Sequence, residues 1–275
     1  MLTSLLLLAA ALNARGRVGS FAVVLGQSPA VVEIGPDERY PMQSVYKFPI
    51  AMAVLHRVDR GELKLDEPIT VRKSELVPAA LHSPVRNAHP GGEFNMSLRE
   101  LLRYAVSESD GTASDVLLRV LGGPPAAQAW LTSLGITDIR IVTTEMEMAR
   151  DNRAQYRNWA TPRAVIALLQ SFCDGNALSK GSRQLLMEFM IDTATGPNRI
   201  RGLLPAGTAV AHKTGTSNTV KGITAATNDI GLVTLPNGGI LAIAVFVSDS
   251  TDDTQTREAA IAQISRQAWD VAVSR

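Results

Sequence analysis

The hydrophobic positions at both ends of the chain follow the pattern of β-strands. Residues 18–25 and 30–34 are rich in β-branched side chains, and Gly26-Gln27-Ser28-Pro29 between them predicts a hairpin. β-Character returns after Ala209 in four apolar runs, and Asn237-Gly238 between the last two predicts a second hairpin. These four predicted strands are residues 210–213, 223–227, 230–235 and 240–247.

The middle of the chain has helical periodicity instead. Residues 44–60 form the first predicted helix. Ser97 and Glu100 form a capping box for a second helix, and an apolar stripe that begins at Ala113 predicts a third. A last helix follows the C-terminal strands, and its apolar face consists of Ile261, Ile264, Ala268 and Val271.

Strands at both ends with helices between them predict an α+β fold. The two terminal segments would share one antiparallel sheet flanked by helices, and the central segment would be an inserted, all-helical subdomain. We place the sheet-and-helix subdomain at residues 1–40 and 197–275, and the helical subdomain at residues 41–196.

Composition favours a globular protein with a small ligand. The 275 residues are 45% hydrophobic, and a chain of this size buries roughly 75% of its unfolded surface. Lysine and arginine number 27 against 26 acidic residues, and no basic block stands out. We therefore expect no nucleic-acid partner.

Cysteine and histidine usage argues against a metal site. The single cysteine, Cys173, lies in an apolar helical stretch, which predicts a buried and inert thiol. The histidines lack the spacing of paired metal ligands and have no cysteine partners, so we expect no metal. They are His56, His82, His89 and His212.

Residues 5–12 form an unbroken apolar run. The run is too short to span a bilayer, which takes about 20 residues. It could be the core of a signal peptide, but no basic residue precedes it, and cleavage near Ala14 would leave few residues before the first strand. We therefore expect a mature N-terminal helix that packs on the sheet.

Three polar motifs and an acidic segment carry the chemistry. Ser44-Val45-Tyr46-Lys47 places a lysine one helical turn after a serine, where the lysine can take the proton of a nucleophilic hydroxyl. Ser109-Asp110-Gly111, Thr144-Glu145-Met146-Glu147 and Lys213-Thr214-Gly215 follow in that order. Together they resemble the SxxK, SDN and KTG motifs, with the acidic loop, of class A serine β-lactamases. Residues 155–159 and 225–229 resemble the extended-spectrum branch of that family.

The resemblance implies a fold and an activity. The fold would be a five-stranded antiparallel sheet flanked by helices, with an inserted helical subdomain and the active site in the cleft between the two parts. The activity would be hydrolysis of the β-lactam amide of penicillins and cephalosporins, which causes antibiotic resistance. We expect a periplasmic or secreted monomer that takes a small-molecule β-lactam and has no cofactor, no membrane partner and no nucleic-acid partner.

The resemblance also assigns catalytic roles. Ser44 would form the acyl-enzyme, and its backbone N–H would join that of Thr216 in an oxyanion hole, with each donor worth roughly 3–4 kcal/mol. Ser109 would carry a proton to the lactam nitrogen, and Glu145 would activate the water that hydrolyses the ester. Either Lys47, whose burial would favour its neutral form, or Glu145 could be the base for acylation.

A second group of residues would bind the substrate. Lys213 would supply positive charge to Ser109 and to the substrate carboxylate. Arg199 is our first choice for a further cation there, because a guanidinium can bind a carboxylate with two hydrogen bonds, and Lys221 is the second choice. The other expected substrate contacts are His82, Gly111, Thr214, Gly215, Thr216 and Ser217.

Several positions depart from the family pattern. Gly111 lacks the amide that the SDN asparagine offers to a substrate side chain, and Ala149 stands where an asparagine often helps to hold the hydrolytic water. Asp115 replaces the asparagine that braces the family's Ω loop, and Thr143 and Asn158 cannot form that loop's customary arginine–aspartate pair. We therefore expect a variant loop conformation.

Two other functions would use the same serine and lysines. A cell-wall DD-peptidase would not need Glu145 in this loop, and a non-hydrolysing β-lactam receptor would be acylated at Ser44 and stop there. Mass spectrometry of the intact protein with a penicillin separates these possibilities, because a transient adduct indicates a hydrolase and a lasting one a receptor or a peptidase.

Overall fold

The computed structural model describes residues 15–275, so the N-terminal apolar run that we expect to be a helix lies outside the described residues. The chain divides into two compact units. Unit 1 contains the chain up to Val45, residues 159–170 and residues 196–275, and unit 2 contains residues 46–158 and 171–195. We expected residues 41–196, with Ser44, in the helical subdomain, but residues 41–45, 159–170 and 196 fall in the unit that contains the sheet, so Ser44 lies in unit 1.

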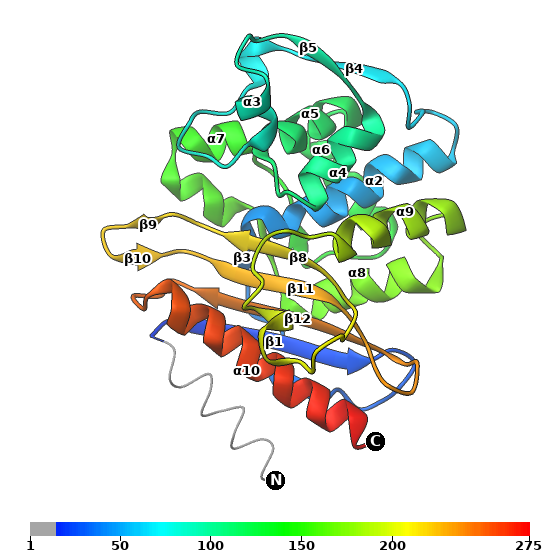
Figure 1. The fold of residues 1–275 in the computed structure, drawn as a ribbon, viewed down its shortest axis with the longest axis vertical. Coiled ribbons are helices and arrows are strands. Elements are labelled where there is room, and N and C mark those ends of the chain that lie inside the picture. The colour runs from blue at the N-terminus through cyan, green and yellow to red at the C-terminus, as the bar shows by residue number, and fades with distance from the viewer. Residues whose placement is uncertain (1–14) are drawn as a thin grey trace. The chain divides into compact units, whose positions relative to one another are not determined.

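A five-stranded antiparallel sheet with the strand order β2-β1-β12-β11-β8 forms the centre of unit 1 (Figure 1). Its middle strand, β12, is buried at every position after the first, which explains its continuous apolar sequence. The sheet expected from the sequence is confirmed. Its strands are β1 (Arg17–Val24), β2 (Val32–Ile34), β8 (Val210–Thr216), β11 (Thr227–Thr234) and β12 (Ile240–Ser248).

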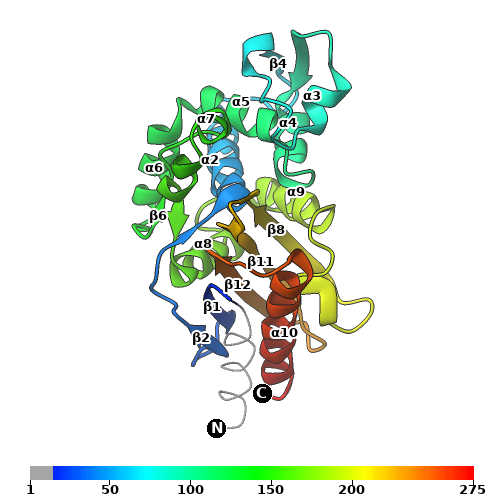
Figure 2. The ribbon, with the colours of Figure 1, turned by 90° about the vertical axis from the view of Figure 1, so that its left-hand side faces the viewer.

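Helix α10 (Thr254–Val273) covers one face of this sheet (Figures 1 and 2). Its apolar stripe is buried against the strands, as its sequence predicts, and forms one hydrophobic core with the sheet. The short helix η4 (Ile200–Leu203) packs beside α10 and contributes Ile200 to the same core.

One predicted strand is wrong. Residues 223–226 do not join the sheet; instead, β9 (Thr219–Val220) and β10 (Ile223–Thr224) form a separate hairpin, and β11 begins only at Thr227. Lys221 and Gly222 both have positive φ angles, as a tight two-residue hairpin turn requires. The apolar residues of this hairpin are partly exposed, so its hydrophobic pattern does not mark a core strand.

The segment that leads to Ser44 is anchored on the sheet of unit 1. Strand β3 (Tyr40–Pro41) pairs with β7 (Trp159–Ala160), after which α8 (Pro162–Asp174) begins. The Tyr40 ring stacks on Phe246, and its hydroxyl donates to the Val18 carbonyl. A Cβ at residue 19 would lie 2.3 Å from this ring, so Gly19 is needed for the close approach.

Unit 2 is built around helix α2 (Lys47–Asp59), which packs against α4, α5, α6 and α9. The predicted capping box of α4 is present, and α5 ends at Gly122 with a φ of 106°.

Unit 2 also contains a two-stranded sheet that the helical reading of the sequence missed, although its Pro68-Ile69-Thr70-Val71 run is short and β-branched. Its elements include η1 (Gln43–Tyr46), which begins in unit 1, β4 (Pro68–Val71), η2 (Lys73–Glu75), α3 (Pro84–Ala88), β5 (Phe94–Ser97), α4 (Leu98–Val106), α5 (Gly111–Leu121), α6 (Pro124–Ser133), β6 (Ile139–Arg140), α7 (Glu145–Arg150), η3 (Asn152–Arg157) and α9 (Lys180–Ile191).

Within residues 15–275, every helix is too short or too polar to cross a membrane.

Candidate active site

Lys47 is a buried cation at the first position of α2. Only 2% of its side chain is exposed, and Nζ lies 2.9 Å from Glu145 Oε1 and 2.7 Å from the Ser109 carbonyl oxygen, to which it donates. Ser44 precedes it in η1, which runs directly into α2, so one continuous helical stretch carries both residues. Three residues that the sequence singled out, Lys47, Ser109 and Glu145, therefore meet in unit 2.

Glu145 begins helix α7, and every backbone N–H of that first turn has an acceptor. Thr144 and Glu147 form a capping box, in which the Thr144 N–H donates to the Glu147 carboxylate and the Glu147 N–H to the Thr144 hydroxyl. The remaining two N–H groups, of Glu145 and Met146, donate to the two oxygens of Asp115, at 2.8 and 2.9 Å. The backbone that carries the Glu145 carboxylate is therefore held by side chains at each N–H.

Asp115, on α5, is a second buried carboxyl group close to the Lys47–Glu145 pair. Loss of solvent, followed by the negative charge of Glu145, raises the pKa of Asp115 to about 7, against the lowering effect of the two backbone N–H groups and of Lys47. Burial, with the charges of Glu145 and Asp115, raises the pKa of the Tyr46 phenol well above its ordinary value. Tyr46 is therefore a neutral hydroxyl beside this cluster.

The turn that contains Ser109 is strained and tightly bound. Ser109 has a φ of 59°, which is uncommon for a residue with a side chain. Asp110 accepts from the backbone N–H groups of Ala113 and Val85 and so holds the loop backbone on both sides of the turn. His82 Nε2 contacts the Glu108 carbonyl at 2.9 Å, and the carbonyl of His82 accepts from the Gly111 N–H.

Asn158 braces the loop before α7 in place of an ion pair. Its buried Oδ1 accepts from the backbone N–H groups of Val142 and Thr143, and its Nδ2 donates to the Thr143 carbonyl at 2.8 Å. Three hydrogen bonds to backbone thus replace the arginine–aspartate pair that the sequence lacks. The sequence identified the missing pair but not this replacement.

In unit 1, the KTG strand lies against the turn that carries Ser44. A Cβ at residue 215 would lie 2.3 Å from the Met42 carbonyl oxygen and 3.2 Å from the Val45 nitrogen, so only glycine permits this approach. Asn228, opposite Gly215 on β11, donates from Nδ2 to the carbonyls of Pro41 and Met42. These contacts bring Gly215 close to Ser44, and the sequence analysis missed the role of Asn228.

The other residues of the KTG region lie at the end of β8. Lys213 and Thr214 are buried, and Thr216 is exposed. The Ser217 hydroxyl accepts from the Ala226 N–H, and the Ser217 N–H donates to the Ala226 carbonyl. Ser217 therefore closes the base of the β9–β10 hairpin.

Arg199 is buried beneath this strand end and is surrounded by acceptors from the protein. Its Nη1 donates to the carbonyls of Gly215 and Asn228, its Nη2 to the Thr216 hydroxyl at 2.8 Å, and its Nε to Glu258 on α10 at 3.0 Å. With 5% of its side chain exposed, it would have to leave some of these partners to bind a substrate carboxylate directly. Lys221, our second choice, is exposed in the β9–β10 turn.

His212 and Asp229 form a buried pair behind the KTG strand. His212 Nδ1 lies 2.9 Å from Asp229 Oδ2, which also accepts from the Ile200 N–H. The pair joins β8, β11 and η4, and the scattered histidines in the sequence gave no sign of it.

Cys173 is half-buried, and loss of solvent raises the pKa of its thiol to about 11, which keeps it protonated.

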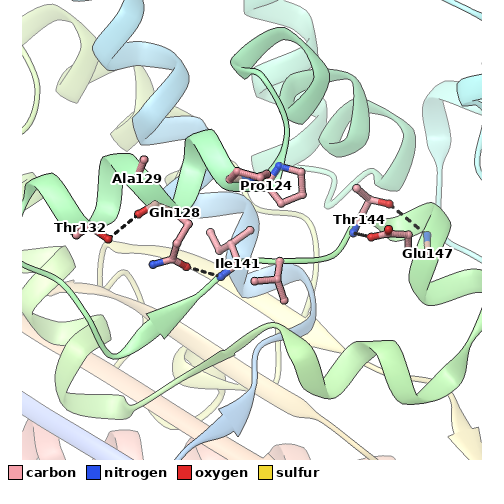
Figure 3. Close-up of a pocket in the computed structure, with 9 residues that line it drawn as sticks. Pro124, Gln128, Ala129, Thr132, Ile141, Thr144 and Glu147 are labelled. Carbon is pink, nitrogen blue, oxygen red and sulfur yellow. Dashed lines mark hydrogen bonds between the residues drawn. The ribbon is translucent and has the colours of Figure 1, made fainter.

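A pocket of about 720 Å³ in unit 2 lies beside the Glu145 helix but does not include Glu145 (Figure 3). It lies between α6 and the segment from Ile141 to Glu147, and the Gln128 side chain bonds to the Ile141 N–H at its wall. Among residues 15–275, no group of three or more potential metal ligands comes together.

Comparisons with known proteins agree with these features. The model of the β-lactamase enzyme family matches residues 7–272. The extended-spectrum β-lactamase PER-1 of Pseudomonas aeruginosa is 44% identical over 236 residues, which cover 86% of this chain and 76% of that protein. β-Lactamase VEB-1 of the same organism is 41% identical over 256 residues, which cover 92% of this chain and 85% of that protein.

Solved structures show the same likeness. The crystal structure of a β-lactamase from Chitinophaga pinensis has a TM-score of 0.95 and 43% identity, and the match covers 99% of this chain and 100% of that one. The TLA-1 extended-spectrum β-lactamase has a TM-score of 0.94 and 42% identity, with 98% of this chain and 99% of that one covered. The chain therefore belongs to the β-lactamase enzyme family, as a class A serine β-lactamase similar to the extended-spectrum enzymes.

Proposed function

We propose that this β-lactamase acts through an acyl-enzyme at Ser44, which is hydrolysed by water that Glu145 activates. The observation that carries the proposal is the buried contact between Lys47 and Glu145, one helical turn after Ser44. A buried acid and base beside a nucleophile provide the proton transfers that both halves of the reaction need.

In acylation, the Ser44 hydroxyl loses its proton to Lys47 or Glu145 as its oxygen attacks the lactam carbonyl carbon. The carbonyl oxygen becomes negative and is stabilised by the backbone N–H groups of Ser44 and Thr216. The bond between the carbonyl carbon and the lactam nitrogen then breaks. The nitrogen takes a proton from Ser109, which recovers one from the group that deprotonated Ser44, and an ester remains on Ser44.

In deacylation, Glu145 takes a proton from a water molecule, whose oxygen attacks the ester carbonyl. The bond to the Ser44 oxygen breaks, and that oxygen recovers the proton that Glu145 took from the water, which restores both groups. A carboxylate in this role contributes typically ~10²–10⁴-fold in rate. The ordered N–H contacts along the first turn of α7 support the role, because they limit the movement of Glu145.

The experiment that tests this function is mass spectrometry of the intact protein during reaction with a penicillin. We expect an adduct of the penicillin's mass that appears and then vanishes as product accumulates. An adduct that persists after the penicillin is exhausted would instead identify the receptor or the DD-peptidase activity. The same sample, followed by absorbance, gives the turnover rate.

Carboxylate recognition gives a prediction for Arg199. Because the guanidinium donates to the Thr216 hydroxyl and the Gly215 carbonyl, Arg199→Ala should loosen the end of the KTG strand, where we expect Lys213 and the Thr214 hydroxyl to bind the substrate carboxylate. KM for a penicillin should therefore rise by roughly 10-fold or more, as loss of a hydrogen bond to a charged group does. Lys221→Ala should leave KM unchanged, since Lys221 is exposed in a turn. Steady-state kinetics of the two variants decide which of the two cations contributes more to binding of the substrate carboxylate. The reverse result would assign that role to Lys221.

Gly111 gives a second prediction. Gly111→Asn should increase kcat/KM for substrates with an acylamino side chain, since it restores an amide donor worth about 0.5–1.5 kcal/mol. A Cβ there would lie 3.3 Å from the His82 carbonyl oxygen and 3.5 Å from Glu145 Cγ, so a slight shift is needed. Gly111→Ala is the matched control, because it adds the Cβ without the amide. Equal loss of kcat/KM in both variants would show that the site is built around glycine.

We also infer from the resemblance that the protein works as a periplasmic or secreted monomer without a cofactor. Size-exclusion chromatography with light scattering tests the monomer, and fractionation of expressing cells tests the location.

A further inference from the structure

Asp115 has a bonding pattern that only an ionised carboxylate can complete. Its Oδ1 accepts from the Glu145 N–H and its Oδ2 from the Met146 N–H. An ionised carboxylate has two acceptor oxygens, whereas a protonated one presents an O–H donor at one of them. Protonation of Asp115 would therefore place a donor against a backbone N–H donor at the start of α7.

The groups that act on this carboxylate come from three neighbouring elements. Glu145 of α7 opposes its negative charge, Lys47 of α2 favours it, and the neutral Tyr46 hydroxyl of η1 lies near it. Helix α6, which also packs on α5, contains no titratable residue. Most charged side chains of the other neighbours, α3, α4 and η2, have partners of their own: Arg86 with the Val77 carbonyl, Arg99 with Asp66, Glu100 with Ser97, Arg103 with Glu108, and Glu75 with Arg119. Lys73 of η2 is exposed.

We propose that Asp115 is a positioning residue that makes deacylation depend on pH: in its ionised form it holds the first turn of α7 and thus Glu145, and in its protonated form it releases that turn. This inference rests on the proposed role of Glu145. It adds that Asp115, which holds the turn, gains and loses a proton as the pH changes.

The pH range follows from the surroundings of the carboxylate. Because the pKa of Asp115 is about 7, it changes charge across the neutral range, far above an ordinary aspartate. The ionised fraction for such a group falls about tenfold from pH 8 to pH 6. The proposed brace is therefore complete in mildly alkaline solution and incomplete in mildly acidic solution.

The first test measures the deacylation rate of a preformed penicillin acyl-enzyme from about pH 5 to about pH 9. In the wild-type protein we expect the rate to fall by up to about tenfold between pH 8 and pH 6. Asp115→Asn should be slower at high pH, because an amide accepts at only one of its two positions, and should lack this inflection. If Asp115 were only a structural brace, Asp115→Asn would lower the rate by the same factor at every pH and keep the wild-type inflection. That result would overturn the proposal.

Glu147→Gln is the matched control. It removes a carboxylate from the same helix, but glutamine can keep the capping box, and Glu147 makes no contact with Lys47 among the hydrogen bonds and ion pairs described here. We expect it to keep the wild-type inflection. Loss of the inflection in this variant too would show that any charge removed from α7 or its neighbours has the same effect, which would overturn the specific role of Asp115.

A second test needs no substrate. A carboxyl group whose pKa is raised in the folded protein stabilises the fold fully below its unfolded pKa, and that contribution is lost as pH rises through the folded pKa. The wild-type protein should thus lose stability from about pH 4 to about pH 7 relative to Asp115→Asn, so Tm of the variant minus Tm of the wild type should rise with pH. A constant difference would overturn the titration of Asp115, whether or not Glu145 activates water.

Discussion

Ser44→Ala is expected to abolish both covalent labelling by a penicillin and its hydrolysis. Among the motif residues, only Ser44 has a hydroxyl followed one turn later by a buried lysine, and an alanine there cannot form the ester. Loss of a nucleophile that acts as a unit with its base costs roughly 10⁴–10⁶-fold in kcat. Intact-protein mass spectrometry and a steady-state assay measure the two effects on one sample.

The fold of this variant is checked separately. Ser44 is only half-buried, so the alanine should leave Tm close to the wild-type value. A folded Ser44→Ala protein that still gained the mass of a penicillin would move the nucleophile to another residue. Ser109 would then be the first position to examine, because it is the second motif serine and its backbone carbonyl accepts from Lys47.

Glu145→Gln should separate the two halves of the reaction. The glutamine keeps the size of the side chain but cannot take a proton from water, so deacylation should slow by ~10²–10⁴-fold, equivalent to about 3–5.5 kcal/mol in barrier. Acylation of Ser44 should remain measurable. The acyl-enzyme should therefore accumulate, and mass spectrometry after rapid quenching should detect it as the main species.

Glu147 is the neighbouring carboxylate that could take over this role. Its Oε2 accepts from the Thr143 hydroxyl and the Thr144 N–H, and its side chain lines the pocket on α6 (Figure 3). Ala149 offers the water no side-chain hydrogen bond. Glu147→Gln should therefore change turnover little, and normal turnover in Glu145→Gln with loss in Glu147→Gln would transfer the role by two residues along the chain.

Removal of Glu145 also has a structural consequence. Lys47 is buried and would lose its contact with a negative partner, and breaking a buried ion pair from one side costs roughly 3–5 kcal/mol. Lys47 lies close enough to Asp115 to lower the pKa of that carboxyl group. The negative charge of Asp115 should therefore offset part of the cost of leaving Lys47 without Glu145. A Tm measurement on Glu145→Gln keeps loss of stability apart from loss of deacylation.

The sequence alone was sufficient for the architecture. Strands with β-branched runs at both ends and helices with capping boxes between them determine an antiparallel sheet and a helical unit, because period-two and period-3.6 patterns bury different faces. The exceptions were residues 223–226, which lie outside the main sheet although a strand was expected there, and the β4–β5 pair, which the helical pattern missed. Local pattern cannot tell whether a strand pairs with the main sheet or with its neighbour in the chain.

The motif residues were also visible in the sequence, since the chemistry of a serine nucleophile demands particular side chains at short spacing. The hydrogen bonds that hold these residues in place were not visible. Asp115 and Asn158 bond to the backbone around Glu145, Asn228 bonds to the turn before Ser44, and Arg199 bonds to the end of the KTG strand. Each of these contacts joins residues far apart in the chain, and a backbone N–H or carbonyl leaves no mark on the sequence.

Tertiary structure thus decided the electrostatics of the site. The sequence determined that a lysine and a glutamate take part, because the motifs carry them. Only the fold placed Lys47 and Glu145 2.9 Å apart and buried a second carboxyl group, that of Asp115, near them. Loss of solvent and the charge of Glu145 raise the pKa of Asp115 to about 7. The reason is physical: the charge state of a buried group depends on solvent exclusion and on distances to other charges, and both are properties of packing.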